Sequence, residues 1–166
     1  MIGVRRSLYV ETTIPSYLAA RPSRDLIVAA HQQVTHEWWR TAREDFELFV
    51  SEAVLAEVRC GDPEVAARRL GLLQDLPVLE VNSAVRRLAE QYERELGLGR
   101  GARRDLLHIA CAVAHEMEYL ATWNCSHLAN AVVVRRLMEA NARHNRSTPL
   151  IVTPDVLLGT ETGELA

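Results

Sequence analysis

The chain has 166 residues, of which 48% are hydrophobic and 25% charged, a composition typical of a globular protein with a sizeable core. No apolar run is long enough to cross a bilayer, and the N-terminus lacks the apolar region of a signal peptide, so we expect a cytoplasmic protein without a membrane partner. A net charge of −3 is not that of a strongly basic nucleic-acid-binding protein.

The basic residues are distributed unusually. All 19 of them are Arg, and several stand in pairs: Arg68-Arg69, Arg86-Arg87, Arg103-Arg104 and Arg135-Arg136. Arg side chains suit phosphate contacts, although pairs on helices more often belong to solvated faces. The cysteines, Cys60, Cys111 and Cys125, match neither a zinc spacing nor a disulfide framework, so we expect buried free thiols.

In chain order, strand patterns alternate with helix patterns. The predicted strands cover residues 7–11, 46–50, 77–81, 119–123 and 150–153. The predicted helices start near residues 15, 25, 52, 63, 83, 105, 126 and 154. Gly97, Gly99 and Gly101 form a flexible connection, and the tail 159–166 is expected to fray, leaving 1–158 as one domain.

This alternation predicts an α/β fold with a parallel five-stranded sheet. Ligands of such sheets gather at the carboxyl ends of the strands, where the strand order reverses. Glu11 ends the first predicted strand, and Asn124 follows the fourth. In a sheet of order 3-2-1-4-5 these two strands are neighbours, so the two side chains are possible neighbours as well.

The stretch from Asp105 to Asn130 is the most informative part of the chain. Asp105 opens an apolar helix, a short apolar strand follows, and Ser126 is placed to cap the next helix. A carboxylate that opens a buried helix, together with polar groups at a strand tip, suggests a site. The alternative is that Asp105 simply stabilises the helix N-terminus through the dipole.

Four short motifs stand in order along the chain: Y-V-E-T-T at residues 9–13, S-E-A-V-L-A-E-V at 51–58, A-R-R-D-L-L-H-I-A-C-A at 102–112, and L-A-T-W-N at 120–124. Together they resemble the PIN-domain family, and within it the VapC-type toxins of type II toxin–antitoxin pairs. The resemblance covers nearly the whole chain and implies a three-layer α/β/α domain. It places Glu11, Glu57, Asp105 and Asn124 at the four positions of an acidic metal site.

The resemblance implies an endoribonuclease that depends on Mg²⁺ or Mn²⁺, with these four residues as metal-binding and catalytic groups. The implied supporting or substrate-contacting residues are Thr12, Thr13, Thr122, His127, Arg103 and Arg104. Two positions depart from the family: Glu11 stands where Asp is usual, and the neutral Asn124 stands at the fourth acidic position. An RNA-binding or interaction module with weak or no catalysis is therefore the alternative.

The resemblance also implies partners: an RNA substrate, a small antitoxin protein and a second copy of the chain. We expect a homodimer that uses the apolar region around Leu18, Trp38 and Trp39. His108 is predicted to be a core or rim residue. An unrelated enzyme acting on a phosphorylated small molecule is disfavoured, because no Gly-rich loop follows the first strand.

Overall fold

A computed structural model describes residues 5–41 and 43–158, so the predicted tail 159–166 lies outside the described residues. The strands are β1 (Arg6–Val10), β2 (Phe46–Ser51), β3 (Val78–Leu79), β4 (Tyr119–Ala121) and β5 (Leu150–Val152). The α-helices are α1 (Thr13–Ala19), α2 (Leu26–Thr41), α3 (Glu52–Val58), α4 (Pro63–Leu73), α5 (Ser83–Leu96), α6 (Arg103–Ala114), α7 (Ala131–Arg143) and α8 (Pro154–Leu158). None of these helices is long and apolar enough to cross a membrane.

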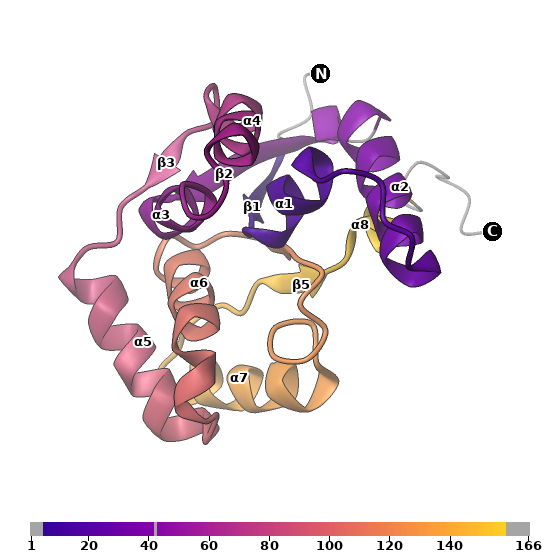
Figure 1. Ribbon diagram of the computed structural model, residues 1–166. Helices are drawn as coiled ribbons and strands as arrows, with labels where there is room; N and C mark the ends of the chain where they lie inside the picture. The colour runs from indigo at the N-terminus through magenta and orange to yellow at the C-terminus, as the bar shows by residue number, and fades with distance from the viewer. Residues whose placement is uncertain (1–4, 42, 159–166) are drawn as a thin grey trace.

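The five strands form one parallel sheet of order β3-β2-β1-β4-β5, which confirms the predicted α/β fold and strand order. Figure 1 shows α1 to α4 on one side of the strands and α5 to α7 on the other. This arrangement follows from right-handed crossovers: the chain moves outward from β1 to β3 and then returns to β4 on the opposite face.

The apolar core fixes the central strand. Leu8, Tyr9 and Val10 of β1 are all fully buried, as expected for a strand with helices on both faces. Beyond Val10, the Glu11 N–H donates to the Ala121 carbonyl at 3.1 Å. The ends of β1 and β4 therefore lie side by side at the point where the strand order reverses.

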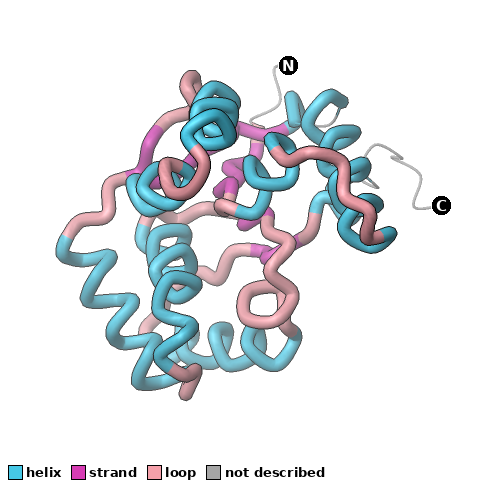
Figure 2. The backbone as a smooth tube through the Cα atoms, viewed as in Figure 1, coloured by secondary structure: helices cyan, strands magenta, loops and turns pink. Residues whose placement is uncertain are grey.

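The predicted helix start at Ser126 is wrong. Residues 122–130 form an irregular loop (Figure 2), and α7 begins at Ala131. Asn130 is the residue that caps this helix, because its side chain accepts hydrogen bonds from the backbone N–H groups of Val132 and Val133. The Ser126 hydroxyl instead donates to the side-chain oxygen of Asn124.

The prediction of buried thiols holds for one cysteine only. Cys111 lies in the core on α6, where burial raises the pKa of its thiol to about 12. Cys60 and Cys125 are exposed, because the first follows the end of α3 and the second lies in the loop after β4. All three are free cysteines.

Candidate functional site

Glu11 is a buried carboxylate at the carboxyl end of β1, with only 4% of its surface exposed. Its Oε2 atom accepts hydrogen bonds from the Thr13 N–H (3.0 Å), the Thr13 hydroxyl (2.6 Å) and the Thr122 hydroxyl (2.8 Å). Among the described residues, no donor contacts Oε1. The threonines therefore compensate the cost of burying this charge and leave one oxygen available to a ligand.

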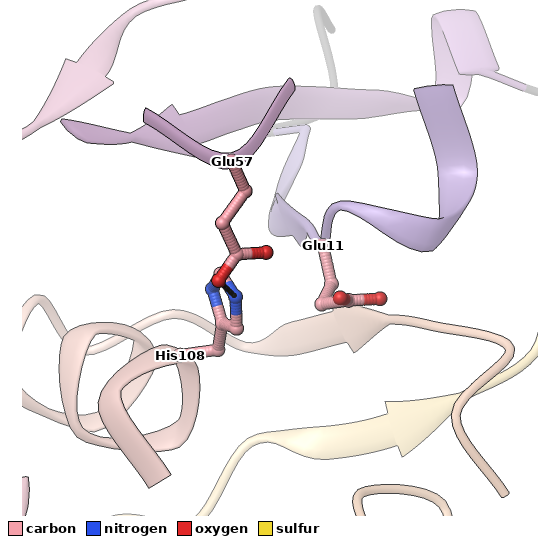
Figure 3. A group of neighbouring side chains, drawn as sticks. All are labelled: Glu11, Glu57 and His108. Carbon is pink, nitrogen blue, oxygen red and sulfur yellow. Dashed lines mark hydrogen bonds and ion pairs between the residues drawn. The ribbon is translucent and has the colours of Figure 1, made fainter. Parts of the chain in front are cut away.

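Glu57 reaches the same place from helix α3. Its Oε2 atom accepts a hydrogen bond from the Thr12 hydroxyl at 2.6 Å, and its Oε1 atom lies 3.3 Å from Nε2 of His108 on α6. Three potential ligand atoms, one from each of Glu11, Glu57 and His108, lie within 4.8 Å of one another. Figure 3 shows Glu57 and His108 facing each other with Glu11 beside them. This triad is a candidate metal-binding group.

The charge on Glu57 is favoured by its neighbours. Burial alone would raise the pKa of this carboxyl group, but the hydrogen bonds from His108 and Thr12 and the positive charge of Arg104 outweigh it. The net result is a pKa below the ordinary value of 4.5. Glu57 is therefore ionised at neutral pH, as a metal ligand must be.

His108 is anchored from behind by a buried hydroxyl. Its Nδ1 atom lies 2.7 Å from the Tyr9 hydroxyl, which is itself 2.7 Å from the Ser51 hydroxyl. Burial raises the pKa of Tyr9 well above its usual value, so this side chain stays a neutral phenol. The imidazole is thus held at both nitrogens, by Tyr9 on one side and Glu57 on the other.

Asp105 and Asn124 form a second group, together with His127. Asp105 lies in the first turn of α6, which begins two residues earlier than predicted, at Arg103. Its Oδ1 atom accepts a hydrogen bond from the Asn124 side-chain amide at 2.9 Å, and its Oδ2 atom lies 2.8 Å from Nδ1 of His127. The Asn124 oxygen accepts from the Ser126 hydroxyl and the His127 N–H. Asn124 therefore connects the loop after β4 to Asp105 through hydrogen bonds.

The hydroxyl of Thr122 joins the two groups. It donates to Glu11, and it accepts a hydrogen bond from the Asn124 N–H at 2.9 Å. The Trp123 N–H donates to the Thr13 hydroxyl at 2.9 Å, which ties the start of α1 to the same loop. Glu11, Asp105 and Asn124 thus belong to one hydrogen-bonded network. Glu57 lies beside Glu11 in the triad but bonds to Thr12 and His108 instead.

The two adjacent arginines differ in their placement. Arg104 lies close enough to Glu57 to lower the pKa of that carboxyl group. Arg103 is largely exposed and forms an ion pair with Glu93 of α5, with 2.8 Å between Nε and Oε1. Arg103 contacts neither the triad nor the Asp105 group.

Sequence reasoning missed the contribution of His108. The residue is buried, as predicted, but it also contacts Glu57 directly. Residues three apart on a helix share a face, so a helix that presents Asp105 to the site also presents His108. The three-residue spacing of Asp105 and His108 is therefore the feature of the sequence that could have placed His108 at the site.

Comparisons with known proteins agree with this architecture. A family model described as PIN domain matches residues 25–124, which is more than half of the chain. The match includes Glu57, Asp105 and Asn124 and ends before the sheet's last strand. A comparison with curated proteins finds no match.

Solved structures share the fold at low sequence identity. One chain of the crystal structure of VapBC2 from Rickettsia felis, bound to a DNA fragment from their promoter, superposes with a TM-score of 0.56. The two chains are 15% identical, and the similarity covers 88% of this chain and 97% of the other. At this identity the likeness concerns the fold.

Proposed function

This chain belongs to the PIN-domain family, and on that premise we propose that it is a metal-dependent nuclease that hydrolyses phosphodiester bonds in RNA. The observation that carries the proposal is the triad of Glu11, Glu57 and His108 at the carboxyl ends of the central strands. This edge of a parallel sheet, next to the reversal of strand order, is where α/β folds place their ligands.

The donors of the triad fit a divalent ion such as Mg²⁺ or Mn²⁺. Glu11 offers Oε1, which has no donor among the described residues, and Glu57 is ionised at neutral pH. Asp105 and Asn124 are linked to Glu11 through the Thr122 hydroxyl, and in this proposal they hold water or substrate around the ion. Oxygen ligands of this kind suit both ions.

A divalent ion at this position would polarise a phosphoryl oxygen and lower the pKa of a bound water. The chain itself supplies the positioning: Thr13 and Thr122 fix Glu11, while Thr12 and His108 fix Glu57. Arg104 adds positive charge beside Glu57, where the phosphate of an RNA strand would need it. His127, held by Asp105, lies at the exposed rim and is a further candidate contact to RNA.

We also propose that the chain is the toxin of a toxin–antitoxin pair, with a small antitoxin protein as its partner. The support is the likeness in fold to a chain of VapBC2, which was crystallised on promoter DNA. Co-expression with the product of the neighbouring reading frame tests this part: a toxin arrests growth alone, and its antitoxin relieves the arrest.

Cleavage of RNA by the purified protein tests the enzymatic part. We expect cutting that requires an added divalent ion and falls by at least about 100-fold in Glu11→Gln and in Asp105→Asn. Glu139→Gln, an exposed residue on α7, is the matched control and should cut like wild type. RNA that is bound but not cut would favour the alternative, an RNA-binding module built on the same fold.

A further inference from the structure

His108 stands out among the residues of the site because it is a nitrogen donor in a position where hydrogen bonds control its tautomer. Only 1% of its surface is exposed, and its Nε2 atom belongs to the triad with Glu11 and Glu57. It approaches the two carboxylates from the opposite side, on α6 (Figure 3). A buried histidine in such surroundings requires a defined partner at each nitrogen.

The hydroxyls behind the imidazole allow two arrangements of protons. In the first, Ser51 donates to Tyr9, Tyr9 donates to Nδ1, and Nε2–H donates to Glu57. In the second, Nδ1–H donates to Tyr9, Tyr9 donates to Ser51, and the lone pair of Nε2 faces the carboxylates. The distances of 2.7 Å along this chain suit both arrangements, because a hydroxyl both donates and accepts.

The second arrangement is the one that metal-binding histidines use. Such a histidine donates its other N–H to an oxygen that fixes the orientation of the ring. The buried Tyr9 hydroxyl, 2.7 Å from Nδ1, is that oxygen here. Changing from the first arrangement to the second moves the imidazole proton from Nε2 to Nδ1 by exchange with water and turns the Tyr9 and Ser51 hydroxyl groups. Neither change requires the backbone to move.

We infer that His108 is a nitrogen ligand of the proposed metal site, which therefore binds a first-row transition ion such as Mn²⁺ in preference to Mg²⁺. Mg²⁺ is a hard ion that selects oxygen ligands, whereas an imidazole nitrogen favours the transition ions. The ligand set of this chain is thus one histidine and two glutamates, Glu11 and Glu57. The inference rests on the proposed function, because it names the ion of that same site.

Binding of Mn²⁺ and Mg²⁺ to the metal-free protein, measured by calorimetry without RNA, tests the selectivity. We expect Mn²⁺ to bind at least about 10-fold more tightly than Mg²⁺. In His108→Gln the affinity for Mn²⁺ should fall by about 10- to 100-fold, while that for Mg²⁺ changes by less than about threefold. His36→Gln removes an exposed imidazole from α2 and is the matched control, with unchanged binding.

Electron spin-echo spectroscopy of the Mn²⁺-loaded protein tests the ligand directly. Wild type should show coupling to a ¹⁴N nucleus, and His127→Gln, which removes the other imidazole near the site, should keep it. His108→Gln should lose it. If that variant does not fold, retention of the signal in His127→Gln still assigns it to His108.

The outcomes separate this inference from the proposed function. Bound Mn²⁺ without nitrogen coupling, or coupling that disappears in His127→Gln, overturns the role of His108 and leaves a metal-dependent nuclease intact. Equal affinity for Mg²⁺ and Mn²⁺ overturns the selectivity. A protein that binds neither ion in this assay overturns the metal site as a whole, and the proposed function with it.

Discussion

A single hydroxyl, that of Thr122, connects the two halves of the candidate site. Thr122 is fully buried, and it bridges the Glu11 carboxylate on one side and the Asn124 backbone on the other. Because Glu11 is buried with its charge, each donor to Oε2 matters to the folded state. The site therefore depends on a residue that carries no charge and would bind no metal itself.

Replacement of Thr122 by Val keeps the shape of the side chain and removes both hydrogen bonds. We expect it to lower the free energy of unfolding by about 1–3 kcal/mol, since it leaves the Asn124 N–H without a partner and Glu11 with one donor fewer. Thr122→Ser retains the hydroxyl and should lose less than about 1 kcal/mol. Urea denaturation of both variants measures the difference. Equal losses would mean that packing, and not the hydroxyl, dominates.

Glu57 makes stability depend on pH. The pKa of this carboxyl group lies below 4.5 in the folded protein, so its contribution to stability is complete above that value and disappears as the pH falls through the folded pKa. We expect Glu57→Gln to be less stable than wild type by about 1 kcal/mol at pH 7. The difference should shrink as the pH falls through the folded pKa and disappear below it, where both side chains are neutral.

Denaturant midpoints of wild type and variant at several pH values measure this gap. Glu37→Gln, an exposed residue on α2, is the control and should show little difference at any pH. A difference in stability that does not shrink as the pH falls through the acid range would contradict a role for the Glu57 charge.

Individual residues also mark the limit of sequence reasoning. Glu11 and Asn124 were placed at neighbouring strand ends by topology alone, and the structure joins them through Thr122. The direction of the Asn124 amide could not be predicted, because it depends on the loop closing over Asp105 and His127. His108 was predicted to be a core or rim residue. Its contact with Glu57 could not be predicted, because it joins two helices far apart in the sequence.

At the scale of elements, the sequence predicted the alternation of strands and helices. It predicted the first and last residues of these elements less accurately. The strand β4 ends at Ala121 and α6 begins at Arg103, each about two residues from the predicted position. The larger error lies at α7. Ser126 and Asn130 are both good capping residues, and only the hydrogen bonds of the folded loop decide between them.

A pair of variants tests this assignment of the cap. We expect Asn130→Ala to lower the free energy of unfolding by about 0.5–2 kcal/mol, because the N–H groups of Val132 and Val133 lose their partner. Ser126→Ala removes an exposed hydrogen bond to Asn124 and should cost less than about 0.5 kcal/mol. Thermal unfolding of the two variants measures the order, and a larger loss at Ser126 would reverse the assignment.

At the scale of the whole molecule, the parallel sheet and its order were predictable because buried strands and crossover helices leave few alternatives. The surface of the expected dimer could not be predicted in the same way. Trp38 is fully buried and Leu18 is 8% exposed, so both pack inside the protomer and are unavailable to a partner. Trp39, the third residue of the predicted surface, is partly buried and packs against the core. Leu26 and Ile27, at the start of α2, are 86% and 69% exposed and are the better candidates for an interface.

The expected homodimer can therefore be tested on α2. Burial of a Leu or Ile side chain contributes about 1.5–3 kcal/mol, and a carboxylate in its place resists desolvation. Light scattering at high micromolar concentration should show a dimer for wild type and a monomer for Leu26→Asp with Ile27→Asp, whose dissociation constant should rise by more than about 100-fold. Met138→Asp, which changes an exposed apolar residue on α7, is the control and should remain dimeric. A dimer that survives the double substitution lies on another surface, and a wild-type protein that stays monomeric rejects the homodimer.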